Sequence, residues 1–244
     1  MGSFLNCLIY RTETKKSFLR GRSFCPKCHH KLSFFDLIPV FSFFVLGGKC
    51  RYCHKKISWQ YPLVEISTGL IFLQIFNSQF SILNFQNLIN LCLLLLVSCF
   101  LILIFVYDLK HYIIPDKFIY PAIGAGLIFS FRNVNFYSSL LAGGGLAGFF
   151  FLIWLVSRGR WIGFGDVKLG FLIGLLVGFP NVFVALCSAS FIGAIMGIGL
   201  TLKGKKTMKS QVPFGPFLVL GTFIALFWGR EIINWYLSFA TYSM

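Results

Sequence analysis

Apolar residues run in long stretches along this chain, separated by short polar segments. Seven stretches approach the length of a membrane-crossing helix, at about residues 62–77, 88–107, 118–131, 136–157, 169–180, 182–202 and 213–237. A crossing helix needs about 20 residues, so 118–131 and 169–180 look short and should extend into their flanking loops. About ten apolar residues precede residue 11, too few to span. We predict an all-α polytopic transmembrane helical bundle of about eight helices, the first abbreviated.

Composition supports this prediction. Of the 244 residues, 57% are hydrophobic and only 12% are charged, and the mean hydropathy is +0.80. A soluble domain of this length cannot hide so much apolar surface, so a membrane protein is expected.

The basic residues predict an orientation. Twenty of the 22 lysines and arginines lie in residues 11–60 or in every second loop after them, leaving only Arg132 and Arg230 for the alternate loops. Loops rich in lysine and arginine are cytoplasmic. The net charge of +15 is therefore mostly a topology signal, and we expect no nucleic-acid partner.

Two acids fall at the same predicted membrane face. Asp108 ends the stretch 88–107 and Asp166 precedes 169–180, and both ends are predicted to be cytoplasmic. Acids at the edge of membrane spans are rare and usually functional. Two carboxyl groups that approach closely share a proton, so one can activate water while the other polarises a peptide carbonyl, as in aspartic proteases. Gly163 and Gly165 would let a substrate strand approach Asp166.

Other interpretations of these acids remain open. Asp166 or Asp116 could be helix N-caps. A proton- or ion-coupled transporter could use Asp108 and Asp166 as a relay, which predicts acids near the bilayer midplane and broken helices around them. A membrane scaffold without catalysis would leave the paired acids unexplained.

Residues 11–60 carry two C-x2-C pairs, Cys25 with Cys28 and Cys50 with Cys53. Four thiolates form a closed structural zinc site, and a reducing cytoplasm disfavours disulfides. Zinc would contribute folding free energy to so small a segment. We interpret the adjoining histidines as neighbours of the site rather than ligands; they are His29, His30 and His54.

We divide the chain into a partial first transmembrane helix (1–10), a cytoplasmic zinc-binding segment (11–60) and a transmembrane domain (61–244). Glu65 is expected to pair with a base or cap a polar contact. The remaining cysteines should be buried by packing; they are Cys7, Cys92, Cys99 and Cys187. No internal repeat is evident.

The order of motifs carries a resemblance. "GSFLNCLIYR", the two cysteine pairs, "YPLVE", "YDLKHYIIPD" and "GFGDVKLG" follow one another over nearly the whole chain. In this order the chain resembles the type IV prepilin peptidases, membrane aspartic peptidases of the GxGD class. The resemblance implies that Asp108 and Asp166 are catalytic and that Cys25, Cys28, Cys50 and Cys53 bind zinc. Lys168 stands at the lysine of the family motif.

The resemblance also implies a substrate and a location. Such enzymes lie in the bacterial inner membrane and cut the basic leader of prepilins and pseudopilins after a glycine, on the cytoplasmic side. Many then methylate the new N-terminus with S-adenosylmethionine, although this sequence has no recognisable fingerprint for that cofactor. The expected partners are therefore prepilin-like precursors and the lipid bilayer.

Overall fold

The computed structural model describes residues 1–14, 23–79, 85–132, 136–202 and 213–242. In these residues the only regular elements are helices, nine α-helices and one short 3-10 helix, which confirms the all-α prediction. The chain forms two compact units, residues 1–76 and residues 77–244. Each unit is described by itself.

The first unit combines two longer helices with a small irregular segment between them. Its elements are α1 (Gly2–Glu13), η1 (Phe35–Leu37), α2 (Phe41–Val45) and α3 (Gln60–Gln79). α1 lies directly against α3, because a Cβ atom on Gly2 would come within 2.6 Å of the Cα of Glu65. The Asn6 side chain donates a hydrogen bond to the Tyr61 carbonyl at 3.0 Å. These contacts join the two helices at their amino-terminal ends.

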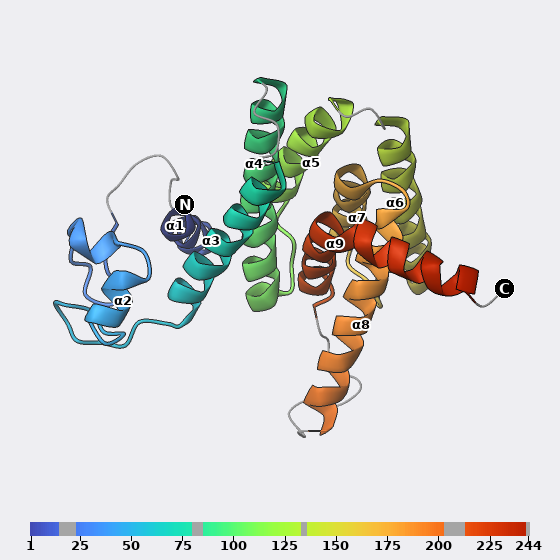
Figure 1. The fold of residues 1–244 in the computed structure, drawn as a ribbon. Coiled ribbons are helices and arrows are strands. Elements are labelled where there is room, and N and C mark those ends of the chain that lie inside the picture. The colour runs from blue at the N-terminus through green and yellow to red at the C-terminus, as the bar shows by residue number, and fades with distance from the viewer. Residues whose placement is uncertain (15–22, 80–84, 133–135, 203–212, 243–244) are drawn as a thin grey trace. The chain divides into compact units, whose positions relative to one another are not determined.

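The second unit contains the remaining helices (Figure 1). They are α4 (Phe85–His111), α5 (Asp116–Phe131), α6 (Phe136–Ser157), α7 (Phe164–Val177), α8 (Asn181–Leu202) and α9 (Gly215–Tyr242). Among the described residues, α4, α6, α8 and α9 are long and apolar enough to cross a membrane. The chain is therefore a multi-pass membrane protein, as its hydropathy predicts.

The short helices behave differently from the long ones. α5 has 16 residues and α7 has 14, so neither covers a bilayer by itself. α7 begins before the predicted range 169–180, inside the flanking loop as expected, but it ends earlier than predicted, at Val177. Gly178 follows its last residue with φ +63°, a conformation that favours glycine and ends a helix.

α7 lies at the centre of this unit, where it packs against α5, α6 and α9. Nine of its residues are buried. Gly174 of α7 meets the backbone of Gly143 in α6 so closely that neither a Cβ atom nor any larger group fits there. Small residues allow such close approach between membrane helices. The outer faces of α6 and α8 instead expose large apolar side chains, including Leu152 and Phe191, as helices facing lipid do.

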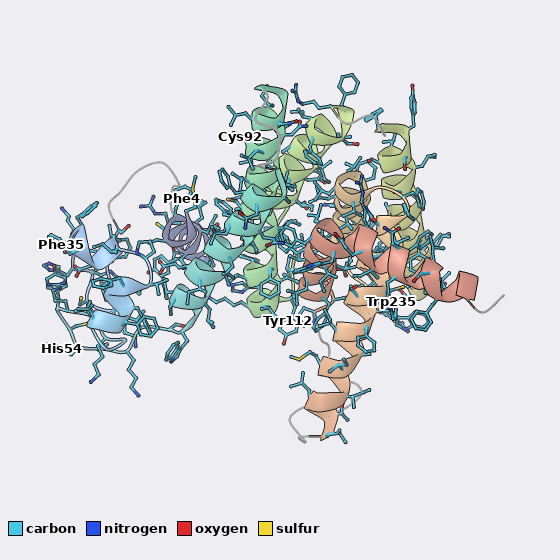
Figure 2. All side chains as sticks on the ribbon, viewed as in Figure 1. Phe4, Phe35, His54, Cys92, Tyr112 and Trp235 are labelled. Carbon is cyan, nitrogen blue, oxygen red and sulfur yellow. The ribbon has the colours of Figure 1, made fainter. Side chains whose placement is uncertain are left out.

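α4 and α5 run side by side and are joined by a tight connection at residues 112–115 (Figure 1). Tyr112 has φ +58°, and Pro115 is the N-cap of α5. Cys92 lies toward one end of α4 and Tyr112 just beyond the other (Figure 2). Cys92 and Cys187 are exposed, so the prediction that packing buries them was wrong.

Candidate active site and metal centre

Asp108 lies near the carboxyl end of α4 and is only 4% exposed. The backbone N–H of Gly215, the first residue of α9, donates a hydrogen bond to its carboxylate. A Cβ atom at position 215 would collide with Asp108 Oδ2, so this contact requires glycine. The positive end of the α9 dipole also faces the carboxylate. Asp108 is thus held by a helix that begins more than 100 positions later in the sequence.

Asp166 is the third residue of α7 and is 8% exposed. The N-cap of α7 is Gly163, and that of α5 is Pro115; neither helix has a side-chain capping bond. The N-cap interpretation was therefore wrong for both Asp166 and Asp116. Instead, the Gly163 backbone N–H donates to the Asp166 carboxylate.

The structure brings the two carboxylates to one end of the second unit. Ile114, in the connection after α4, lies against both Gly165 and Gly215, where added Cβ atoms would approach it to 2.9 and 3.3 Å. Asp108 and Asp166 are close enough to interact electrostatically. Both acids lie near an end of their helices, whereas the relay hypothesis predicts acids near the bilayer midplane.

The two glycines of the GxGD segment have different surroundings. Gly165 faces Ile114, so its missing side chain serves packing between α7 and the connection after α4. A Cβ atom at Gly163 would meet nothing closer than 3.8 Å, where it reaches Asp166 Oδ2. An added side-chain atom at Gly163 would therefore be in ordinary van der Waals contact with the acid, whereas one at Gly165 would collide with Ile114; substrate approach at the two glycines stays a prediction.

Lys168 does not pair with the buried acids. Its ammonium group donates to Asp116 Oδ1 of α5 at 2.5 Å. The same nitrogen lies 4.7 Å from the centre of the Tyr120 ring and 5.4 Å from that of Phe164, within the range of a cation–π contact. Lys168 thus ties the start of α7, which carries Asp166, to the start of α5.

Sequence reasoning missed Asp116, Ile114 and Gly215. Asp116 was considered only as a cap, although a second acid in "DLKHYIIPD" was a signal for a partner of Lys168. The signal for Gly215 was "PFGP": Pro216 is typical of the first turn of a helix, and it marks the start of α9. Nothing local in the sequence indicates that this start meets Asp108.

The four predicted cysteine ligands come together in the first unit. Their sulfur atoms all lie within 4.8 Å of one another, and the Sγ atoms of Cys25 and Cys53 are 4.0 Å apart. Zinc–sulfur bonds of about 2.3 Å in a tetrahedron put sulfur atoms about 3.8 Å apart. Among the described residues the group contains no histidine. The thiols therefore fit a closed zinc site, with the histidines as neighbours.

The segments "CPKCHHK" and "CRYCHKK" fold alike. Cys25 N–H donates to the His30 carbonyl and His29 N–H to the Cys25 carbonyl, at 3.0 and 2.9 Å. Twenty-five residues later, Cys50 and His54 make the corresponding bonds at 3.0 and 2.9 Å. His29 and His54 both have positive φ, 58° and 54°. The expectation of no internal repeat was therefore wrong.

Backbone N–H groups of the first of these segments also change the pKa of the Cys25 thiol. Burial alone raises the pKa of Cys25, but hydrogen bonds from the backbone of Cys28 and Lys27 and from the Cys28 and Cys50 side chains together lower that pKa to about 7. A lowered pKa favours the thiolate, the form that binds zinc.

Glu65 makes a polar contact of the predicted kind. Its Oε2 accepts the Val40 backbone N–H at 2.7 Å, and Val40 has φ +63°. Glu65 thus anchors the unusual backbone before α2 to α3. The Ser3 side chain also donates a hydrogen bond to this carboxylate.

These features define a class: a multi-pass helical membrane protein with a buried aspartate pair at one helix end and a four-thiol metal centre. Residues 1–79 match the bacterial peptidase A24 N-terminal domain family, and residues 95–198 match the type IV leader peptidase family. The chain belongs to the type IV leader peptidase family.

Three curated relatives illustrate this membership, and each is named prepilin leader peptidase/N-methyltransferase. The protein of Aeromonas salmonicida is 34% identical, with 98% of this chain and 90% of the relative aligned. That of Pseudomonas aeruginosa is 30% identical, with 100% and 92% aligned. That of Bacillus subtilis is 31% identical, with 98% and 95% aligned. No solved structure matches the chain.

Proposed function

We propose that this chain is a prepilin leader peptidase and that Asp108 and Asp166 carry its chemistry. One observation carries the assignment of residues: two buried aspartates from distant segments interact at one end of the helices. The chain is a peptidase by family, and no other pair of acids in the described residues is buried together.

The pair supports peptide hydrolysis without a metal at the acids. Because the two carboxyl groups share one proton, one is ionised and takes a proton from water. The water oxygen attacks the scissile carbonyl carbon while the protonated carboxyl donates to the carbonyl oxygen. The tetrahedral intermediate then loses the amine, whose nitrogen takes a proton from the pair as the C–N bond breaks. Which aspartate starts ionised depends on the pair as a whole.

The substrate class follows from the relatives, which are named for prepilins. We propose cleavage after glycine. We place this reaction at the cytoplasmic face of the bacterial inner membrane, because the basic loops adjoin the acid end of the helices. A prepilin's apolar helix would stay in the bilayer while its basic leader reaches the acids. Pseudopilins carry the same chemistry and are equally suitable substrates.

Two further groups belong to this proposal. Zinc at Cys25, Cys28, Cys50 and Cys53 would hold residues 23–57 together and would take no part in the hydrolysis. Methylation of the new N-terminus by S-adenosylmethionine is proposed from the relatives' names alone. We assign no residue to that cofactor.

The test is cleavage of a prepilin-like precursor by purified protein in lipid, with products identified by mass spectrometry. Asp108→Asn and Asp166→Asn should each lower kcat/KM by about 10²–10⁴-fold, the range for losing an acid–base group. Glu231→Gln is the matched control, because it removes an exposed acid of the same unit. A folded Asp108→Asn or Asp166→Asn variant that cleaves at the control rate would refute the assignment. An added methyl group on the product would establish the second activity.

A further inference from the structure

A cavity of about 660 Å³ lies at the end of α7 remote from Asp166. The distance along α7 from Asp166 to Val177 is about 17 Å at 1.5 Å per residue. The ends of α5, α6, α7 and α8 line the cavity together with one side of α9. Its polar lining residues are Ser138, Ser139, Asn181, Arg230 and Asn234. It is therefore separate from the acid pair and has its own polar groups.

One polar group around this cavity has no partner within the described parts of the chain. Ser139 is 9% exposed and lines the cavity, but the unpaired group is on Asn181. Asn181 Oδ1 is buried and unpaired, although the Nδ2 of the same side chain donates to the Val177 carbonyl at 3.4 Å. Buried polar groups are normally hydrogen-bonded, and leaving one unpaired costs about 1–3 kcal/mol. A ligand that carries a hydrogen-bond donor would satisfy the Asn181 oxygen.

Arg230 supplies charge at the mouth of the cavity. It is exposed and has no acidic partner among the described residues, and no acid lines the cavity. The other arginine predicted at this membrane face already has a hydrogen-bond partner, because Arg132 Nε donates to Asn90 Oδ1 at 3.1 Å. An unpaired guanidinium beside hydroxyl and amide groups suits a phosphate, which it can bind through two parallel hydrogen bonds.

The surroundings indicate where the phosphate would come from. Exposed aromatic residues adjoin the lining residues in sequence: Tyr137 precedes Ser138, and Trp235 and Tyr236 follow Asn234. Figure 2 shows Trp235 on the carboxyl-terminal part of α9. Tyrosine and tryptophan are enriched at membrane–water interfaces, where lipid headgroups lie. The phosphates present there in quantity are those of phospholipids.

We propose that this cavity binds the phosphate-bearing headgroup of a phospholipid from the leaflet opposite the acid pair. Arg230 binds the phosphate, while Ser139 and Asn181 bind the hydroxyl or amine groups of the headgroup. Only the choice of leaflet rests on the topology in the proposed function. Headgroup binding itself needs neither cleavage nor a prepilin.

Native mass spectrometry of the full chain in detergent tests the proposal with phosphatidylglycerol as the probe. Arg230→Gln should weaken phosphatidylglycerol binding by about tenfold, as expected for losing one charge-assisted contact. Ser139→Ala should weaken it less. The matched control is Arg132→Gln, which removes an arginine predicted at the same membrane face but outside the cavity lining. Equal binding by the Arg230→Gln and Arg132→Gln variants would overturn the proposal.

Two further arms identify the source of the phosphate and keep the proposals separable. Inorganic phosphate alone should compete poorly, because it lacks the headgroup's additional hydroxyl groups. If it displaces phosphatidylglycerol at equal concentration, the site is one for free phosphate and the lipid assignment is wrong. The Asp108→Asn protein should bind lipid like the parent. Cleavage that survives Asp108→Asn would therefore refute the proposed function alone, whereas phosphatidylglycerol binding that survives Arg230→Gln would refute the headgroup site alone.

Discussion

The two units of this chain are stabilised in different ways. In residues 23–57 of the first unit only Cys25, Phe43 and Cys50 are buried, so two of the three buried side chains are thiols. In the second unit α7 alone buries nine residues against neighbouring helices. The first arrangement has four thiols that could be held together by a metal, whereas the second is held by side chains and close backbone contacts.

Exposed aromatic residues support this difference. Phe34 and Phe35, next to each other at η1, are 79% and 69% exposed, and Phe44 of α2 is 60% exposed. Figure 2 shows Phe35 on the surface of this segment. A segment that leaves its own aromatic side chains uncovered has too small a core to fold on hydrophobic burial alone. Zinc coordination supplies folding free energy directly in such cases.

The largest predicted effect is that metal removal unfolds residues 23–57 of the first unit and spares the second unit. Chelation, or Cys25→Ser with Cys50→Ser, should abolish amide protection in residues 23–57, because structural zinc contributes about 10–16 kcal/mol in small peptides. Helices α4 to α9 should keep their protection. Hydrogen exchange read by segment measures both at once.

The control for metal removal is Cys92→Ser with Cys187→Ser, which removes two exposed thiols outside the cluster. This variant should retain one zinc per chain and unchanged exchange in both units. If chelation leaves residues 23–57 protected, the contrast between the units disappears.

The next largest effect concerns the contact between α6 and α7. Gly174→Ala places a methyl group where the backbone of Gly143 already lies. Overpacking typically costs about 1–3 kcal/mol, and more where backbone must move, so thermal unfolding of the second unit should shift down. Gly144→Ala is the matched control, because nothing lies within 4 Å of its added Cβ atom. Equal stability of the Gly174→Ala and Gly144→Ala variants would contradict the packing argument.

Much of this architecture could be predicted because it depends on local patterns. Hydropathy over windows of about 20 residues identified the spans that became α4, α6, α8 and α9. The spacing within each C-x2-C pair fixes two sulfur atoms near each other, which is why the four-thiol cluster could be expected. Both signals can be identified within a short continuous stretch of sequence.

The rest depends on contacts between distant segments. α7 ends before Gly178, where the chain turns toward α8. The apolar run in the sequence continues to residue 180 and therefore predicted a later end. The contact of Gly215 with Asp108 follows from how α9 packs. The repeat of the two C-x2-C segments was missed although they share four of seven residues, because the backbone hydrogen bonds and positive φ that make it a structural repeat are not visible in the sequence.

A smaller effect should come from the ion pair near the acids. Lys168→Gln removes the tie between α7 and α5 without touching either buried aspartate, so we expect kcat to fall by about tenfold while KM changes little. Asp116→Asn should have the same effect. The double variant should cost no more than either single change, since all three lose one interaction.

Rescue distinguishes an ion pair from a general need for charge. Exchanging the two residues, with Lys168→Asp and Asp116→Lys, should recover part of kcat if the tie positions Asp166. A double variant whose losses simply add would show that Lys168 acts independently of Asp116. In that case the second unit's acid site would depend on helix packing alone.

The smallest effect is expected in the first unit, at Asp36. This carboxylate accepts hydrogen bonds from the Ser33 backbone and hydroxyl at 3.0 and 2.8 Å and from Arg51 Nε at 2.9 Å. Burial alone raises the pKa of Asp36, but the hydrogen bonds from Ser33 and the charge of Arg51 outweigh burial and leave it below its ordinary value.

A lowered pKa means that Asp36 stabilises the folded state above the unfolded pKa of about 4, and that this contribution is lost as pH falls through the folded pKa. Asp36→Asn should therefore lower the stability of this segment by about 1–2 kcal/mol. The loss is measured as weaker zinc retention against a chelator. It should be constant from about pH 6 to 8, where Asp36 stays ionised. Because the metal dominates, zinc stoichiometry should not change. A loss of zinc as complete as that of the Cys25→Ser variant would show that hydrogen bonds, rather than the metal, hold this segment together.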